Sequence, residues 1–113
     1  MALFAIAIPV LPGKTEGLRA FTKELMSTHH EEFKKSRQDM KVHERTFFQS
    51  TPMGDIVIVT LEGNNPQEAM VKFGMATDDF TNWFVAQVKE LHGVDLRQPL
   101  PGSMPELIAD SEA

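Results

Sequence analysis

Three polar residues, His43, Glu44 and Arg45, stand next to one another in a segment rich in β-branched and aromatic residues. On a strand, His43 and Arg45 share one face and Glu44 takes the other, because side chains alternate along a strand. Arginine suits a carboxylate or enolate oxygen, and histidine or glutamate can move a proton. The alternative is a solvated strand edge with an ion pair within or between subunits, since a buried charge is costly unless it is paired.

His29 fills the empty place in an apolar helical stripe, four positions after Leu25 and four before Phe33. At this spacing His29 should point at the sheet, and His30 should lean toward solvent. His29 is then either a general base that lines a pocket between helix and sheet, or a hydrogen-bonded core residue. A metal pair with Glu32 lacks a third ligand, so we expect no metal site here.

The composition describes a soluble globular protein and excludes several classes of partner. The chain has 113 residues, of which 42% are hydrophobic and 24% charged, with a formal net charge of -5. This length fits a single domain, 1–113. The acidic balance argues against nucleic acid and anionic membrane surfaces as partners, because both need a basic protein face.

The sequence contains no cysteine, which rules out disulfides, thiolate nucleophiles and cysteine-ligated metals and fits a cytoplasmic location. The apolar start of the chain is interrupted by Pro9, Pro12 and Gly13 and lacks the basic region of a signal peptide. It is also too short to span a membrane. We therefore expect 2–10 to form a buried strand.

Two β-rich runs on either side of a Thr51-Pro52-Met53-Gly54 turn predict a hairpin over 41–62. Pro52 supplies a fixed φ, and Gly54 suits the left-handed position of a three-residue loop with a bulge. A register that differs by one residue would change the cross-strand partners. With the bulge, one face of the hairpin combines Val42, Glu44, Thr46 and Phe48 with Ile56, Ile58 and Thr60.

Helical periodicity predicts the elements around this hairpin. One helix should extend over 15–37. A cap at Asn65 starts a short helix, and the acidic pair at 78–79 starts another near its positive end. Gly93 should end this last helix in a left-handed conformation.

Along the chain, the predicted elements are a strand, a helix, two strands and a pair of helices. An extended tail follows over 95–113, in which 106–110 is a candidate edge strand. This α+β order matches the ferredoxin-like βαββαβ arrangement, an antiparallel sheet with its helices on one face. The strands over 2–10 and 56–61, however, are apolar on both faces. Burying ~400 Å² of the uncovered face is worth roughly 10 kcal/mol before association costs. We therefore predict a homodimer whose sheets pack face to face as a dimeric α+β barrel.

Two segments carry a likeness to known proteins: HERTFFQSTPMGDIVIVTLEG over 43–63 and DDFTNWFVAQVKELHGVDL over 78–96. With them, the chain resembles the dimeric α+β barrel superfamily over most of 2–95. That superfamily includes antibiotic-biosynthesis monooxygenases, EthD-like proteins, muconolactone isomerases and haem-degrading monooxygenases, and the chain is most similar to an uncharacterised branch. The resemblance is specific for architecture, because the superfamily hosts several chemistries.

Trp83 and His92 match in type the Trp and His on the late helix of haem-degrading members. Two departures argue against haem. Nine residues at ~100° each place the two side chains on opposite faces of a straight helix, and the first strand lacks the polar Asn of those relatives. We therefore expect no cofactor, with Trp83 in the core or a pocket wall and His92 stabilising the negative helix end.

Two hypotheses follow. The resemblance implies a small-molecule-binding dimer, or a cofactor-independent monooxygenase or isomerase, that takes an apolar, aromatic or polyketide-like ligand and works by proton transfer or by oxygenation of an activated carbanion. The alternative is a non-catalytic dimeric module whose cavity binds a ligand or is filled by its own side chains. For the first hypothesis, the candidate catalytic residues are His29, His43, Glu44 and Arg45, and the candidate substrate-binding residues are Trp83, Phe48 and Phe84.

Overall fold

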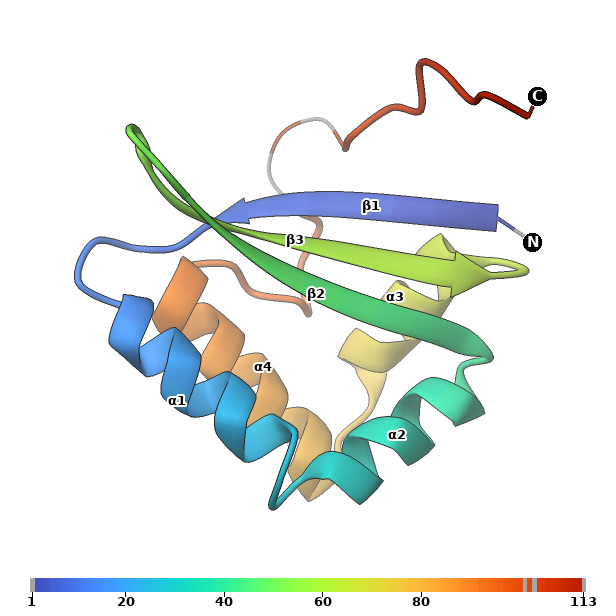
Figure 1. Ribbon diagram of the computed structural model, residues 1–113. Helices are drawn as coiled ribbons and strands as arrows, with labels where there is room; N and C mark the ends of the chain where they lie inside the picture. The colour runs from blue at the N-terminus through green and yellow to red at the C-terminus, as the bar shows by residue number, and fades with distance from the viewer. Residues whose placement is uncertain (1, 101, 103, 113) are drawn as a thin grey trace.

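The computed structural model describes residues 2–100, 102 and 104–112, and in this part of the chain a three-stranded sheet carries four helices on one side (Figure 1). An α+β fold with an antiparallel sheet and helices on one face is therefore confirmed. Along the chain, the elements are β1 (Ala2–Pro9), α1 (Thr15–Leu25), α2 (His30–Asp39), β2 (Val42–Thr51), β3 (Gly54–Gly63), α3 (Pro66–Met75) and α4 (Asp79–His92).

β3 is the central strand, with β1 and β2 antiparallel on either side. Its run of β-branched residues over 56–60 suits a strand that has a neighbour at each edge. Leu61 of β3 lies between Phe4 of β1 and Glu44 of β2 in the register of the sheet. Glu44 therefore belongs to a row of side chains whose other members are buried in the core.

The hairpin between β2 and β3 closes through a two-residue turn, so the predicted three-residue loop with a bulge is wrong. Thr51 pairs directly with Gly54 across Pro52 and Met53. Gly54 has a φ of +126°, which favours glycine. Because no extra residue is inserted, the register moves by one, and Glu44 shares its face with 57, 59 and 61 instead of 56, 58 and 60.

The single helix predicted over 15–37 is also wrong, because it breaks after Leu25 and resumes at His30 as α2. The hydroxyl of Ser27 donates a hydrogen bond to the carbonyl oxygen of Lys23 at 2.6 Å. Serine and threonine compete for backbone groups in this way, which weakens a helix interior. The break changes the direction of the chain and brings α2 beside β2 (Figure 1).

The predicted starts of the later helices are confirmed. The side chain of Asn65 accepts a hydrogen bond from the backbone N–H of Glu68 at 3.3 Å, and Asp78 accepts one from Thr81 at 3.2 Å. Both caps satisfy N–H groups that have no partner within the helix. Gly93 ends α4 with a φ of +70°, as the sequence predicts.

The candidate edge strand over 106–110 does not form. In the described residues after Met104, the chain has no strand pairing, and the side chains of Leu107 and Ile108 are exposed. Two adjacent apolar residues bury too little surface to hold a short strand against the sheet. Within the described residues, the sheet therefore has the first three strands of the predicted βαββαβ order.

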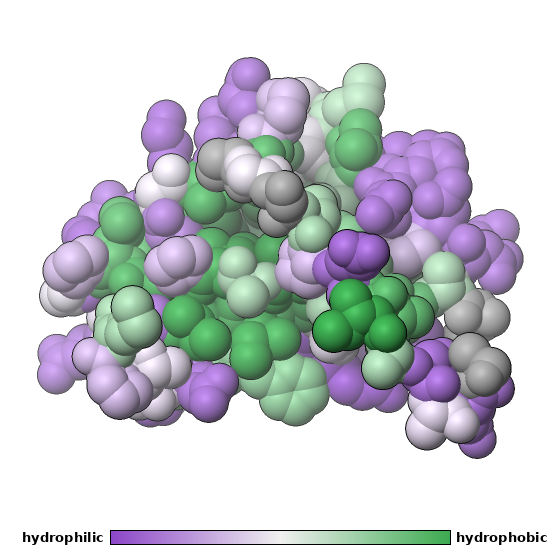
Figure 2. All heavy atoms as spheres, turned by 90° about the horizontal axis from the view of Figure 1, so that it is seen from above, coloured by the Kyte–Doolittle hydropathy of each residue, from purple (hydrophilic) through white to green (hydrophobic). Residues whose placement is uncertain are grey.

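Two clusters of buried side chains join the helices to the sheet. One lies mainly between α1, α3, α4 and β3, and the other combines β1, β2 and β3 with α3. None of the helices in the described part of the chain lies over the opposite face of the sheet (Figure 1). On that face Leu3 and Phe47 are 61% and 52% exposed, and Figure 2 shows apolar atoms gathered across its middle with polar side chains around them.

Candidate ligand-binding site

A cavity of about 350 Å³ lies between the helices and the sheet. Its walls are mostly aliphatic and aromatic, and they come from all three strands and from α1, α2, α3 and α4. Cavities of this size and composition are typical of sites for small organic molecules. The apolar lining includes Ile6, Ile8, Leu18, Phe21, Leu25, Phe33, Val57, Val59, Leu61, Phe73, Phe84 and Val88.

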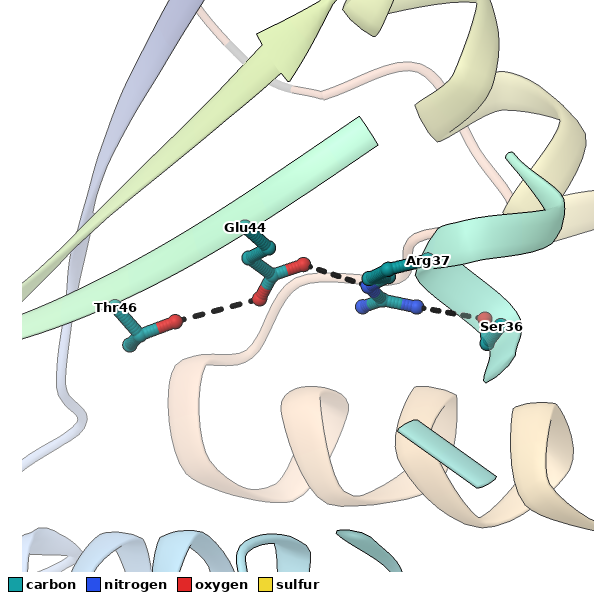
Figure 3. A network of polar contacts seen from close by, with 4 residues as sticks. All are labelled: Ser36, Arg37, Glu44 and Thr46. Carbon is teal, nitrogen blue, oxygen red and sulfur yellow. Dashed lines mark hydrogen bonds and ion pairs between the residues drawn. The ribbon is translucent and has the colours of Figure 1, made fainter. Parts of the chain in front are cut away.

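An ion pair interrupts this apolar lining. Arg37 of α2 donates from Nε to Oε1 of Glu44 on β2 at 2.8 Å, and the two side chains are 9% and 7% exposed. Thr46, two residues along the same strand, donates from its hydroxyl to the other carboxylate oxygen of Glu44 at 3.3 Å. Arg37 also donates from Nη1 to the hydroxyl of Ser36 at 3.0 Å. Figure 3 shows the four side chains as one network between α2 and β2.

Three phenyl rings surround the guanidinium of Arg37. Its Cζ atom lies 4.3 Å from the ring centre of Phe73 and 4.9 Å from those of Phe33 and Phe84. Guanidinium groups stack on aromatic faces and are less strongly hydrated than ammonium groups. The rings and Glu44 therefore hold a positive charge in a fixed position inside an apolar cavity.

His92, the last residue of α4, is another polar residue in the cavity lining. Its Nδ1 lies 2.8 Å from the carbonyl oxygen of Pro9. Burial lowers the pKa of His92, and the hydrogen bond to Pro9 raises it by less. The imidazole is therefore neutral near pH 7. Since a carbonyl only accepts, Nδ1 carries the proton and Nε2 is left as an acceptor.

His29, which was expected to point at the sheet, lies outside this cavity lining. Because the helix breaks before it, His29 turns toward α4 and stacks on Trp83 with 4.1 Å between ring centres. Its Nδ1 donates to the carboxylate of Glu32 at 2.7 Å. Trp83 packs in turn on Phe21, at 5.2 Å between ring centres. The two candidates thus form an aromatic contact between the start of α2 and α4.

The other candidate residues divide between the two faces of the sheet. Glu44 and Phe84 line the cavity. Arg45 borders the cavity, but its side chain pairs with Glu62 at 3.6 Å on the opposite face, where His43 also lies exposed. Phe48 lies near the hairpin end, where the guanidinium of Arg19 covers its ring at 4.7 Å.

Sequence reasoning did not select Arg37, and it treated His92 only as a helix-end residue. A signal for both exists in the spacing of apolar residues. Arg37 follows Phe33 by four positions, and His92 follows Val88 by four. A polar residue that continues an apolar helical stripe faces the core, so each was identifiable as a buried polar group.

Among the residues that the structure describes, no group of three histidine, aspartate or glutamate side chains is placed to hold a metal ion. In the same residues, no helix combines the length and the apolar character needed to cross a membrane. Comparison of the chain with protein-family models, with curated proteins and with solved structures gave no match.

Proposed function

We propose that this protein binds a small apolar or aromatic molecule in the cavity between its helices and its sheet. The observation that carries the proposal is an apolar cavity of about 350 Å³ that contains a buried, aromatic-lined Arg37–Glu44 pair. A packed core filled by its own side chains would leave no such space. Polar groups placed among apolar walls are the usual means of orienting a bound ligand.

A thermal-shift experiment with 2-naphthol, a two-ring neutral probe, tests this function. A ligand that binds only the folded protein adds about 2.7 kcal/mol of stability at 100 times its Kd. The matched variants are Val59→Phe, which fills part of the cavity, and Val71→Phe, at an exposed position on α3. We expect a stabilising shift for the wild type and for Val71→Phe and a much smaller one for Val59→Phe. Equal shifts in all three would place the probe elsewhere.

We also propose that the protein is a homodimer of the dimeric α+β barrel type, with the open faces of two sheets packed together. The exposed Leu3 and Phe47 support this assembly, as does the apolar patch in Figure 2. A stable interface commonly buries about 800 Å² on each partner. A large apolar face left in water would be unusual for a monomer.

Sedimentation analysis of Phe47→Asp, with Val71→Asp on α3 as the control, tests the dimer. Phe47 is on the open face, and Val71 is also exposed but lies on the helical layer. A buried aspartate without a partner should weaken the dimer by about 100-fold or more, because desolvating an unpaired charge is costly. A wild-type protein that sediments as a monomer at micromolar concentration would overturn this assembly.

A second candidate function is cofactor-independent proton transfer on the bound molecule, as in isomerases and monooxygenases of the dimeric α+β barrel superfamily that the sequence resembles. The neutral imidazole of His92 favours this second function. Its Nδ1 donates to the carbonyl oxygen of Pro9, and no other described residue bonds to Nε2, so Nε2 can accept a proton from a bound ligand. Exchange of the acidic C–H of 2-tetralone in heavy water, followed by NMR, tests this activity. We expect the wild type to accelerate exchange and His92→Gln to lose that acceleration while still binding 2-naphthol.

A further inference from the structure

The charges around the cavity cancel. Arg37 and Glu44 form a pair at 2.8 Å, and the charged end of Arg45 is directed out of the cavity, to the opposite face of the sheet where Glu62 lies. His92 is neutral near pH 7 because burial disfavours its charged form. The described residues of the wall therefore offer no uncompensated positive charge, although they include a buried arginine.

We infer that the cavity selects neutral apolar molecules that carry a hydroxyl group and rejects those that carry a carboxylate, with Glu44 as the residue that sets this preference. The inference rests on the proposed ligand-binding function and adds the chemical class of the ligand. It concerns the polar contact made at Glu44, and it does not depend on whether the bound molecule reacts.

A carboxylate ligand would meet an arginine that is already occupied. To pair with Arg37 it would have to displace Glu44, whose side chain is 7% exposed. That displacement would leave one buried carboxylate without a partner or crowd two of them around one guanidinium, and both arrangements are strongly unfavourable. In the apolar surroundings supplied by Phe73 and its neighbours, water cannot compensate for the lost pairing.

A hydroxyl group finds a suitable acceptor at the same place. Among the residues that the structure describes, the Oε2 atom of Glu44 accepts one long hydrogen bond, 3.3 Å, from Thr46. A carboxylate oxygen has room for a second donor, and hydrogen bonds to an ionised acceptor are stronger than neutral ones. A ligand hydroxyl can therefore bind Glu44 without disturbing its bond to Arg37.

Three probes of the same two-ring shape test this selection with the full-length protein: 2-naphthol, 2-methylnaphthalene and 2-naphthoate. Calorimetric titration near pH 7 should give the tightest binding for 2-naphthol. We expect 2-methylnaphthalene to bind about 10-fold more weakly, through loss of one charge-assisted hydrogen bond. We expect 2-naphthoate to bind at least about 100-fold more weakly than 2-naphthol.

The isosteric variant Glu44→Gln removes the negative charge and should narrow the difference in affinity between 2-naphthol and 2-naphthoate, because Arg37 then lacks a counter-ion. The matched control is Glu62→Gln, which removes a carboxylate from the pair on the opposite face. We expect 2-naphthoate to gain at least about 10-fold in affinity for Glu44→Gln and to be unchanged for Glu62→Gln.

The outcomes separate this inference from the function on which it rests. If none of the three probes binds the wild type, the proposed function and the inference both fail. If 2-naphthoate binds the wild type as tightly as 2-naphthol, the cavity binds ligands but the charge selection is wrong. The wild-type ranking decides this even if Glu44→Gln does not fold, and an unchanged 2-naphthoate affinity in a folded Glu44→Gln also overturns the inference.

Discussion

Neighbouring residues of β2 form the same kind of ion pair on opposite faces of the sheet. Glu44 points to the helices and meets Arg37 at 2.8 Å, with both side chains less than a tenth exposed. Arg45 points away from the helices and meets Glu62 at 3.6 Å, with side chains 49% and 37% exposed. The comparison shows that strand alternation alone separates a buried pair in a ligand cavity from a solvated pair on an open surface.

The two pairs also differ in what surrounds them. Around Arg37 the water is replaced by the rings of Phe33, Phe73 and Phe84. On the other face, water screens the charges of Arg45 and Glu62. Removing one partner should therefore have very different consequences on the two faces.

The largest effect is expected for Arg37→Met, which leaves Glu44 buried without its counter-ion. Breaking a buried pair in this way should lower the free energy of unfolding by about 3–5 kcal/mol, measured by urea denaturation. The double variant Arg37→Met with Glu44→Leu removes both charges and should recover most of that loss. A single variant that loses less than about 1 kcal/mol would show that the pair is solvated in solution.

A smaller effect is expected from protonation of His92. Burial lowers its pKa in the folded protein below the ordinary value of 6.5. As the pH falls below about 6.5, the unfolded chain therefore binds more protons than the folded protein. The free energy of unfolding decreases over this range, until the pH reaches the pKa of His92 in the folded protein. For one titrating group, the slope of the free energy of unfolding against pH cannot exceed about 1.4 kcal/mol per pH unit.

Urea unfolding at pH 7.0, 6.0 and 5.0 measures this slope. His92→Gln should flatten it relative to the wild type. The carboxyl groups with lowered pKa values, Asp55, Asp78 and Glu90, lose their contribution only as the pH falls below their ordinary values of 3.8 to 4.5. An unchanged slope in His92→Gln would mean that another group titrates in this range.

The sequence was sufficient where local chemistry determines the structure. Asn65, Asp78 and Gly93 mark helix ends through their own side chain or backbone conformation, and the structure places the ends there. The alternation of β2 likewise separates Glu44 from His43 and Arg45 without knowledge of any partner.

The sequence was insufficient where one residue decides between two local alternatives. A single inserted residue at Gly54 would have exchanged the faces of β3 relative to β2. The weak helix formers over 27–29 break the helix. The helical spacing that predicted His29 to point at the sheet therefore no longer applies. The spacing after Phe33 could place Arg37 on the core side of its helix, but the partners that it meets from other elements, Glu44, Phe73 and Phe84, are not visible within the helix alone.

The smallest effect is expected for Arg45→Ala. Its exposed pair with Glu62 contributes at most about 1 kcal/mol, so urea unfolding of the protomer should hardly change. Binding of 2-naphthol should also stay the same, because the side chain is directed away from the cavity. If the open faces form the subunit interface, the dimer dissociation constant should change while these two properties do not, and sedimentation measures it. Loss of 2-naphthol binding by a folded Arg45→Ala protein would instead mean that Arg45 reaches the ligand, and the separation of the two faces would not hold.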